Sequence, residues 1–516
     1  MPRASDGGRV FGLYFEDPAI GLCFNIPGVG GDMPGFEDLV NRTVAYMKHT
    51  GQNFMSYPGV WYHGLIGKGY QPRAHMAGYL EAWYERFDRE GLGFMPSVNL
   101  HTIPFTPHVP VSAANVADGT FNGTCADIVD DGTVASKWHH QPPTYNGLHP
   151  QVQAEIDRMV DALLAEGAPH PSFKGIDFYF HTAHDLPWLG TIHAGYNDWA
   201  IDAFSRDTGI KPPVDRADPE RGRKYAEWLK ANAYEQWVAW RSKMFAAWVR
   251  RMAKRIAAVR GDLQLCITAQ SLIEYEKQDP ATPHLQRKLM REGALDSELL
   301  VDVPNLVLRL GCRPLGPQAY RGKTSTRKEE VLLMNAEYEA EYWEPLQAAR
   351  EPQLNIHDHY YESAMGSKTP LKAPWFRETG WRVCAINPLG RNAMKAYIDP
   401  FRHGDVLGIT RGGFLIATYG LEPMIVPFAK AYTALPRKRF KDVEACSTDA
   451  VKVRRLSDGG RNWVYAVNTG AEPAKVSLPC GKTQVVDLAT GLPAKEWRDG
   501  RLELSLAPYE FRAFVR

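Results

Sequence analysis

Residues 151–180 read QVQAEIDRMVDALLAEGAPHPSFKGIDFYF, and this stretch decides the expected fold. Residues 151–166 have the apolar spacing of an amphipathic helix, and residues 175–180 form a short apolar run typical of a buried strand. The same order, a helix followed by a strand, recurs along most of the chain. Strands that alternate with helices in this way predict βαβ units and a parallel sheet.

Eight such strands are expected in the first 440 residues. They are residues 10–15, 53–57, 93–99, 175–180, 263–268, 305–310, 353–360 and 406–410. Helices are expected at residues 36–49, 76–90, 151–166, 231–259, 285–292, 328–349 and 391–401. Eight units favour an α/β fold of the (β/α)8 TIM-barrel type. An open doubly wound sheet is the alternative, although no G-x-G-x-x-G motif follows any of these strands.

The last segment of the chain has a different pattern. From about residue 442 the helical period disappears, and short runs with β-branched residues are separated by Gly, Asp and Pro clusters. This pattern predicts a small C-terminal antiparallel β-sandwich. We therefore expect two domains, a catalytic barrel at residues 1–440 and a β-sandwich at residues 441–516.

The composition limits the classes of function. Sixty Lys and Arg residues balance 59 Asp and Glu residues, which argues against a nucleic-acid partner or a membrane surface. No apolar run is long enough for a transmembrane helix. The seven cysteines form no CxxC pair, so neither a zinc site nor a disulfide framework is expected. The compartment stays open between the cytoplasm and a periplasmic or secreted location with a signal peptide removed, and so does the formation of a homo-oligomer.

Aromatic residues are abundant, with 14 Trp, 23 Tyr and 21 Phe. Trp237, Trp240 and Trp248 recur at helical spacing, which indicates a packed helix face rather than a cofactor site. Other aromatic and polar residues follow the strands, whose C-terminal ends surround the active site in a barrel. The expected substrate-binding residues are Glu16, Trp61, His101, Asp177, Tyr179, His181, His184, Trp188, Gln270, Glu274, Arg309, Arg313, Asp358, Tyr360, Trp375 and Arg411.

Two carboxylates are the minimum for glycoside hydrolysis, one to protonate the leaving oxygen and one to act as nucleophile or base. Asp185 and Glu362 follow the fourth and seventh strands, so they would face each other across the barrel mouth. Asp358, Tyr360 and Glu362 share one strand face by the period of two, which is expected to be the inner one. The alternative for each acidic loop residue is a solvated surface charge.

Other residues at the strand ends suggest how a sugar would be held. Trp61, Trp188 and Trp375 are candidate stacking platforms, with core packing as the alternative for each. Three arginines, Arg309, Arg313 and Arg411, could clamp an anionic sugar. The alternative for these arginines is ion pairing with local carboxylates.

Two parts of the sequence resemble known glycosidases. Residues 195–210, GYNDWAIDAFSRDTGI, resemble the segment after the fourth strand in family 42 β-galactosidases and related clan A barrel glycosidases. Residues 464–469 and 506–511 resemble the closing β-domain of many glycosidases. The resemblance implies a retaining hydrolase with its acid after strand four and its nucleophile after strand seven.

The sequence departs from that family at the acid. Clan A enzymes usually carry Asn-Glu at the end of the fourth strand, whereas residues 181–185 here read HTAHD. The acid is therefore Asp185 or a carboxylate on another loop, of which Glu16, Glu274 and Glu276 are candidates.

Two other functions stay open. A catalytically inert carbohydrate-binding barrel would explain the missing Asn-Glu. A metal-dependent barrel hydrolase could use His357 and His359, which have ligand spacing on one strand face, but no third ligand is indicated. We expect a glycoside hydrolase with no cofactor and no metal, whose partner is a carbohydrate substrate.

Overall fold

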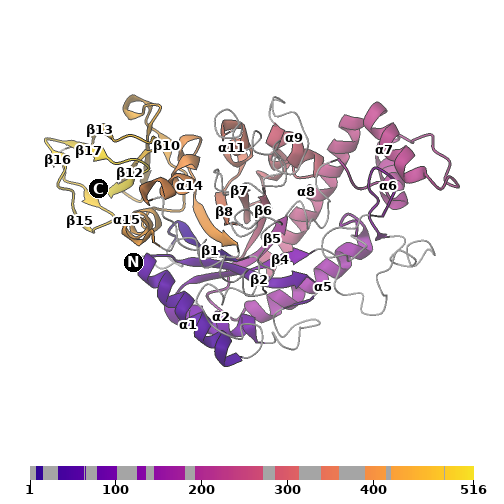
Figure 1. Ribbon diagram of the computed structural model, residues 1–516, viewed down its shortest axis with the longest axis horizontal. Coiled ribbons are helices and arrows are strands. Elements are labelled where there is room, and N and C mark those ends of the chain that lie inside the picture. The colour runs from indigo at the N-terminus through magenta and orange to yellow at the C-terminus, as the bar shows by residue number, and fades with distance from the viewer. Residues whose placement is uncertain are drawn as a thin grey trace, which may run out of the picture.

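The computed structural model describes residues 7–15, 33–62, 64–65, 78–100, 125–134, 145–180, 192–270, 285–312, 339–358, 390–413, 420–481 and 483–516 (Figure 1). At the ends of some helices and strands only the backbone is described. Within these ranges the chain forms a barrel of parallel strands, an inserted helical segment and a C-terminal β domain.

The predicted barrel is confirmed. Eight parallel strands surround a common axis in the order β1-β2-β4-β5-β6-β7-β8-β9, and β1 closes the ring by pairing with β9 as well as β2. A Cβ atom at Gly12 of β1 would lie 1.7 Å from the carbonyl oxygen of Phe54, so only glycine allows this close pairing. The strands are β1 (Val10–Phe15), β2 (Phe54–Tyr62), β4 (Gly93–Leu100), β5 (Gly175–Phe180), β6 (Gln264–Gln270), β7 (Leu306–Cys312), β8 (Pro352–Asp358) and β9 (Gly408–Gly413).

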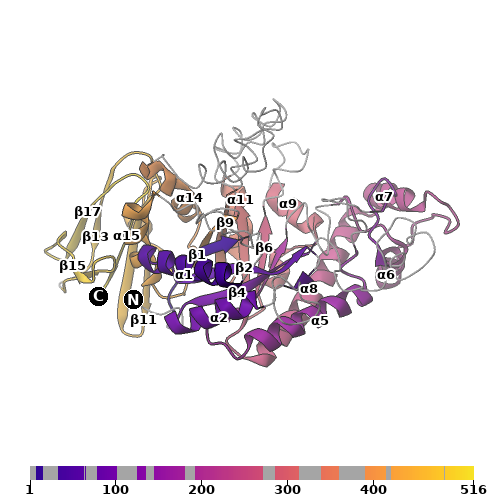
Figure 2. The ribbon, with the colours of Figure 1, turned by 60° about the horizontal axis from the view of Figure 1, so that its bottom comes forward.

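Helices cover the outside of this ring (Figures 1 and 2). The main ones are α1 (Met33–Thr50), α2 (Tyr79–Glu90), α5 (Pro150–Gly167), α8 (Tyr234–Val259), α9 (Leu285–Glu292), α11 (Glu339–Ala348), α14 (Lys395–Ile398) and α15 (Glu422–Thr433). The expected helix at residues 231–259 begins later, because Ala233 leaves helical geometry and separates α7 (Arg221–Asn232) from α8. Helix α15 was not expected, since Pro423 and Pro427 interrupt its helical sequence signal.

Most of the described aromatic side chains pack between strands and helices. Trp237 and Trp240 of α8 are buried and stack with ring centroids 5.2 Å apart. Trp83 of α2 is fully buried against Phe36 and Phe87. The expectation that the α8 tryptophans form a packed face is therefore confirmed.

A helical insertion separates β5 from α8. It contains α6 (Asp198–Thr208) and α7, at the end of the molecule opposite the β domain (Figure 2). Residues 125–134 join it through a bridge between Val129 and Ala194. At this joint, buried Asp127 accepts the backbone N–H groups of Ile128 (2.9 Å) and Gly195 (2.8 Å). The insertion therefore ties the loops after β4 and β5 to each other.

The C-terminal β domain consists of two antiparallel sheets, as predicted. One has the order β10-β11-β12-β18-β14-β15 and the other β13-β17-β16. Apolar residues of both sheets, among them Val453, Leu478, Leu504 and Phe514, form a core between them. The strands are β10 (Lys441–Asp442), β11 (Val451–Asp458), β12 (Arg461–Asn468), β13 (Ala474–Pro479), β14 (Val486–Asp487), β15 (Leu492–Pro493), β16 (Trp497–Arg498), β17 (Arg501–Leu506) and β18 (Phe511–Val515).

Candidate active site

The barrel lumen is lined by alternate residues of the strands. Asp177 of β5, Thr268 of β6 and Arg309 of β7 contact one another inside the ring. Their neighbours along each strand, such as Ile267 and Leu308, belong to the apolar core under the helices. This alternation places polar groups inside the barrel because side chains of a strand point to opposite faces in turn.

Asp177 is the centre of a buried hydrogen-bond network. Its Oδ1 accepts the hydroxyl of Thr268 (2.7 Å), and its Oδ2 accepts Nη1 of Arg309 (2.8 Å) and the hydroxyl of Ser56 (3.2 Å). Nε and Nη2 of Arg309 donate to Gln353 Oε1 at 3.3 and 3.1 Å. Asp177 is fully buried and Arg309 is 1% exposed. The pair is therefore charge-balanced within the lumen.

Apolar side chains close the lumen below this network, at the N-terminal ends of the strands, which we call the floor. Val10, Phe54, Met95, Cys266 and Val307 form one buried cluster, and the Arg309 guanidinium lies 5.6 Å from the Phe54 ring centroid. Burial raises the pKa of the Cys266 thiol far above its usual range, so this cysteine stays protonated and is a poor nucleophile.

Aromatic and amide groups lie towards the C-terminal ends of the strands, which we call the mouth. The rings of Tyr14 and Tyr179 are 5.1 Å apart across the lumen, and both residues are almost fully buried. Asn355 of β8 accepts the hydroxyl of Thr410 of β9 (2.8 Å). The described lumen thus changes from an apolar floor through an ion pair to tyrosines beneath the mouth.

Arg411 lies on the outer face of the barrel wall. It belongs to the same strand face as Ile409, which packs under the helices, and its guanidinium lies 5.0 Å from the Tyr397 ring of α14. Arg309 faces inward instead and is paired with Asp177. The expected clamp of arginines is thus not formed by its two described members, because the strand alternation sends them to opposite faces.

In the described part of β8 the odd-numbered side chains point into the lumen and the even-numbered ones point out of it. Gln353 and Asn355 point into the lumen, where they bond to Arg309 and Thr410. Leu354 and Ile356 belong to the core under the helices. The face expected to point inward was that of Asp358, Tyr360 and Glu362, whose side chains lie outside the described residues.

Most of the expected site residues lie outside the described residues. For Trp61, Gln270 and Asp358, the backbone lies in β2, β6 and β8, but the side chain is outside the description. The residues wholly outside it are Asp185, Glu362, Glu16, His101, His181, His184, Trp188, Glu274, Arg313, Tyr360 and Trp375, and so are the alternative acid Glu276 and His359.

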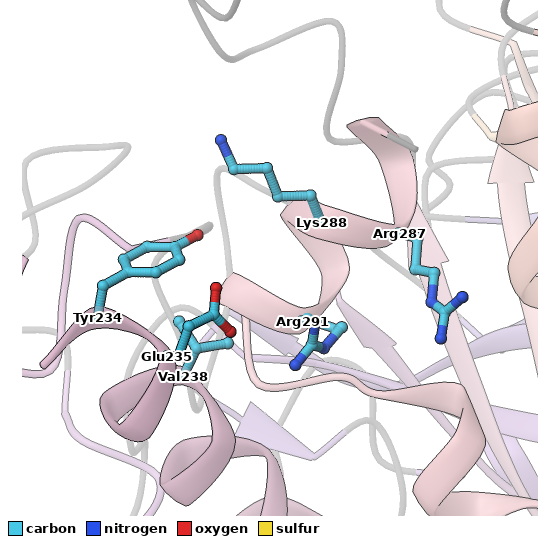
Figure 3. Close-up of a pocket in the computed structure, with 6 residues that line it drawn as sticks. All are labelled: Tyr234, Glu235, Val238, Arg287, Lys288 and Arg291. Carbon is cyan, nitrogen blue, oxygen red and sulfur yellow. The ribbon is translucent and has the colours of Figure 1, made fainter. Parts of the chain in front are cut away.

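Sequence reasoning missed a cavity of about 400 Å³ between α8 and α9. Figure 3 shows Tyr234 and Glu235 of α8 facing Lys288 and Arg291 of α9. In a barrel the helices run back antiparallel to the strands, so the N-terminal end of α8 lies on the mouth side. Arg291 pairs with Asp296 at 3.2 Å, so its charge is partly neutralised. In the sequence this cavity is indicated only by the three basic residues within residues 287–291.

Two typical features are absent from the described ranges of the chain. No group of three or more His, Cys, Asp or Glu residues there could hold a metal ion. No helix in the described part of the chain is both long and apolar enough to cross a membrane.

Comparisons with known proteins support the fold. No family model and no curated protein sequence matches the chain. Among solved structures, Eubacterium rectale Amy13B matches with a TM-score of 0.50 and 9% identity over 100% of this chain and 96% of that chain. The Geobacillus thermoleovorans α-amylase, solved with acarbose, matches with a TM-score of 0.48 and 12% identity over 99% and 98% of the two chains.

At such identities the likeness concerns the fold alone. The chain has the architecture of a (β/α)8 barrel followed by a β domain, which it shares over nearly its whole length with Eubacterium rectale Amy13B. The barrel fold implied by the glycosidase resemblance is thus supported, whereas its assignment to family 42 is not.

Proposed function

We propose that this protein is a glycoside hydrolase that cleaves glycosidic bonds in an oligo- or polysaccharide with two carboxylates. The observation that carries the proposal is the closed parallel barrel. The residues that follow β5 and β8 in the sequence are rich in acidic and aromatic side chains. Because all eight strands are parallel, the chain leaves Phe180 and Asp358 at the same end of the ring. Active sites of this fold lie at that end.

In the proposed reaction Asp185 is the general acid and Glu362 the nucleophile. The acid protonates the leaving oxygen, and the nucleophile attacks the anomeric carbon to form a covalent glycosyl intermediate. Water then hydrolyses the intermediate with the first carboxyl acting as base, so the anomeric configuration is retained. Trp61, Trp188 and Trp375 are the proposed platforms for the sugar rings.

The lumen supports this chemistry from below. Asp177 and Arg309 neutralise each other and leave the middle of the lumen without net charge. Tyr14 and Tyr179 form a rigid aromatic layer that is buried beneath the mouth. The described arginines offer no free cation to the lumen, which favours a neutral sugar over an anionic one.

The test uses Glu362→Gln and Asp185→Asn, with Glu444→Gln as a matched control, because Glu444 is an exposed residue of the β domain. Each site variant should lower kcat on the best substrate of a glycan panel by at least about 10²-fold and keep sugar binding. The control should match the wild type. Full activity in both site variants would overturn the assignment.

Two further outcomes separate the alternatives. Wild-type protein that binds glycans but releases no product from any of them would favour the inert binding barrel. Activity that is lost on chelation and restored by a divalent metal would favour the metal-dependent hydrolase. The anomeric configuration of the first product, followed by NMR, tests retention.

A further inference from the structure

A second cavity lies beside the N-terminal ends of β8 and β9, where the β domain meets the barrel. It has a volume of about 220 Å³, large enough for a small molecule rather than a single water. Pro352 at the start of β8 and Val406 before β9 line it, so it is at the end of the barrel opposite the mouth. Trp343 and Phe440 contribute apolar walls.

The one buried carboxylate of this cavity is already satisfied. Asp405 accepts Nη2 of Arg9 (2.9 Å), the hydroxyl of Tyr465 (2.6 Å) and the backbone N–H of Phe440 (2.7 Å). Arg9 is fully buried, so its charge and that of Asp405 cancel at the back of the cavity. Asp405 therefore has little capacity left to neutralise the other cations.

Two arginines in the cavity wall keep donors to spare. Arg454 donates Nη1 to the Phe401 carbonyl (2.8 Å) and pairs through Nε with Asp442 (2.7 Å). Arg439 donates Nη2 to carbonyl oxygens at the end of α11, and it has no carboxylate at ion-pair distance in the described part of the chain. The wall thus carries one positive charge in excess.

His403 adds a polar side chain that lacks a hydrogen-bond partner among the described residues and lies near several positive charges. Its Nε2 is buried and has no hydrogen-bond partner among the described residues. Burial, together with the positive charges of Arg402, Lys452 and Arg454, lowers the pKa of His403 to about 4. The imidazole is therefore neutral at pH 7 and stands beside more positive than negative charge in the cavity wall.

We propose that this cavity binds a small molecule bearing an oxyanion group, a phosphate or a carboxylate, against Arg439, Arg454 and His403. The apolar part of the ligand would lie against Trp343 and Phe440. Arg439 and Asp442 are exposed and form the solvent side of the cavity, which gives a ligand its way in. The site is separate from the proposed active site at the mouth and does not depend on it.

The proposal has a definite pH dependence. A bound anion favours the charged imidazolium, so it raises the pKa of His403, and protonation in turn tightens binding. A rise from about 4 to about 6 on binding would make the anion bind about tenfold more tightly at pH 5 than at pH 7.5.

The experiment measures sulfate binding to the full chain by calorimetry, because sulfate does not titrate in this range. Ionic strength is held constant with chloride. We expect saturable binding that tightens about tenfold from pH 7.5 to pH 5, and loss of this pH dependence in His403→Gln. Arg439→Gln should weaken binding about tenfold or more.

Lys438→Gln is the matched control, since Lys438 neighbours Arg439 but pairs with Asp458 and does not line the cavity. Its affinity should equal that of the wild type. Methyl phosphate and acetate at pH 7.5 then identify which oxyanion is preferred. Absence of saturable binding for all three probes, or equal affinity in the wild type and His403→Gln at both pH values, would overturn the proposal.

Discussion

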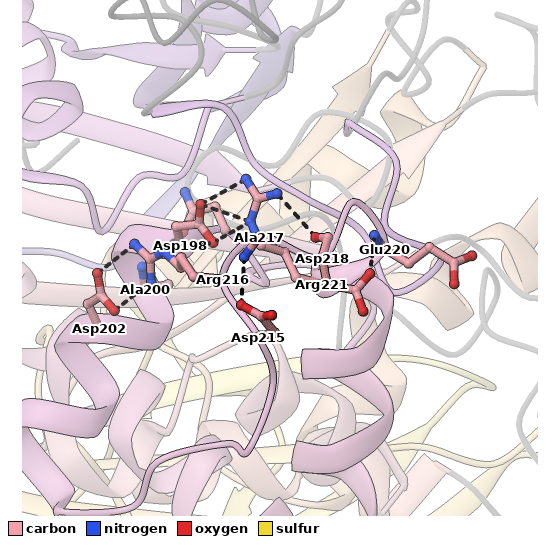
Figure 4. A network of polar contacts seen from close by, with 10 residues as sticks. Asp198, Ala200, Asp202, Asp215, Arg216, Ala217, Asp218, Glu220 and Arg221 are labelled. Carbon is pink, nitrogen blue, oxygen red and sulfur yellow. Dashed lines mark hydrogen bonds and ion pairs between the residues drawn. The ribbon is translucent and has the colours of Figure 1, made fainter.

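Two ion-pair systems in this protein have the same chemistry but different surroundings. In the lumen, Asp177 and Arg309 pair at 2.8 Å and are 0–1% exposed. On the insertion, Arg216 forms a bidentate pair with Asp202 at 2.7 and 2.8 Å, and Arg221 binds Asp198 (Figure 4). The side chains of Arg216 and Asp202 are 53% and 60% exposed.

The difference shows how burial changes what an ion pair does. A buried pair has lost its hydration, so each charge depends on its partner and on the hydrogen bonds around it. Ser56, Thr268 and Gln353 supply those bonds in the lumen. An exposed pair is solvated before and after it forms and is screened by salt, so its net contribution is small.

Breaking the lumen pair is expected to have the largest effect. Arg309→Met leaves the Asp177 carboxylate buried without a countercharge, which should lower the free energy of unfolding by about 3–5 kcal/mol. Denaturant unfolding followed by tryptophan fluorescence measures the change. The double variant Asp177→Asn/Arg309→Met removes both charges and should recover at least half of the loss. A single variant as stable as the wild type would contradict the comparison.

Asp127 tests burial without a close ion pair. Burial raises the pKa of this carboxyl to about 7, although the Arg241 guanidinium opposes the shift. Since the folded pKa exceeds the unfolded value of about 3.9, the native state binds the extra proton between these values. The free energy of unfolding should fall by about 1.4 kcal/mol per pH unit from pH 5 to pH 7 through this group.

Asp127→Asn provides the control for that slope. The amide oxygen can still accept the N–H groups of Ile128 and Gly195, but it cannot ionise. The slope of the unfolding free energy against pH should therefore be less negative in the variant by about 1.4 kcal/mol per unit. Equal slopes in both proteins would show that the carboxyl is ionised in the folded state.

The junction between barrel and β domain should respond less strongly. Tyr465→Phe removes one of the three donors to the Asp405 carboxylate, and Arg9 and Phe440 N–H remain. A hydrogen bond to a buried charge contributes about 1.5–3 kcal/mol, so the unfolding free energy should fall by that amount. Tyr84→Phe is a control, because the Tyr84 hydroxyl is buried far from this cluster and has no hydrogen-bond partner among the described residues. A loss as small as the control's would contradict the proposed role of Tyr465.

The sequence is sufficient to predict the barrel because eight apolar strand segments alternate with helical segments along the chain. The runs at 10–15 and 175–180 coincide with β1 and β5. Helix α15 is not predicted, because prolines are typical of loops rather than helices. Tertiary packing overrides that local signal in the structure. The break at Ala233 carries no glycine or proline, so nothing in the sequence indicated it.

The candidate site was predicted less well than the fold. The sequence marks Asp177 and Arg309 as polar residues of their strands but not as partners, since it does not specify which side chains of β5 and β7 lie at the same level of the lumen. Arg411 was assigned to the mouth because a one-residue difference in register moves a side chain to the other face. The proposed catalytic roles of Asp185 and Glu362 stay predictions.

The exposed pair should give the smallest effect and complete the comparison. Arg216→Gln removes the fork that binds Asp202, and the free energy of unfolding should fall by only about 0.2–1 kcal/mol. At 1 M salt the Debye length is about 3 Å, so the difference from the wild type should shrink towards zero. The loss in Arg309→Met should persist at the same salt concentration, because its charges are out of contact with solvent. If salt abolished both losses equally, burial would not be what separates the two systems.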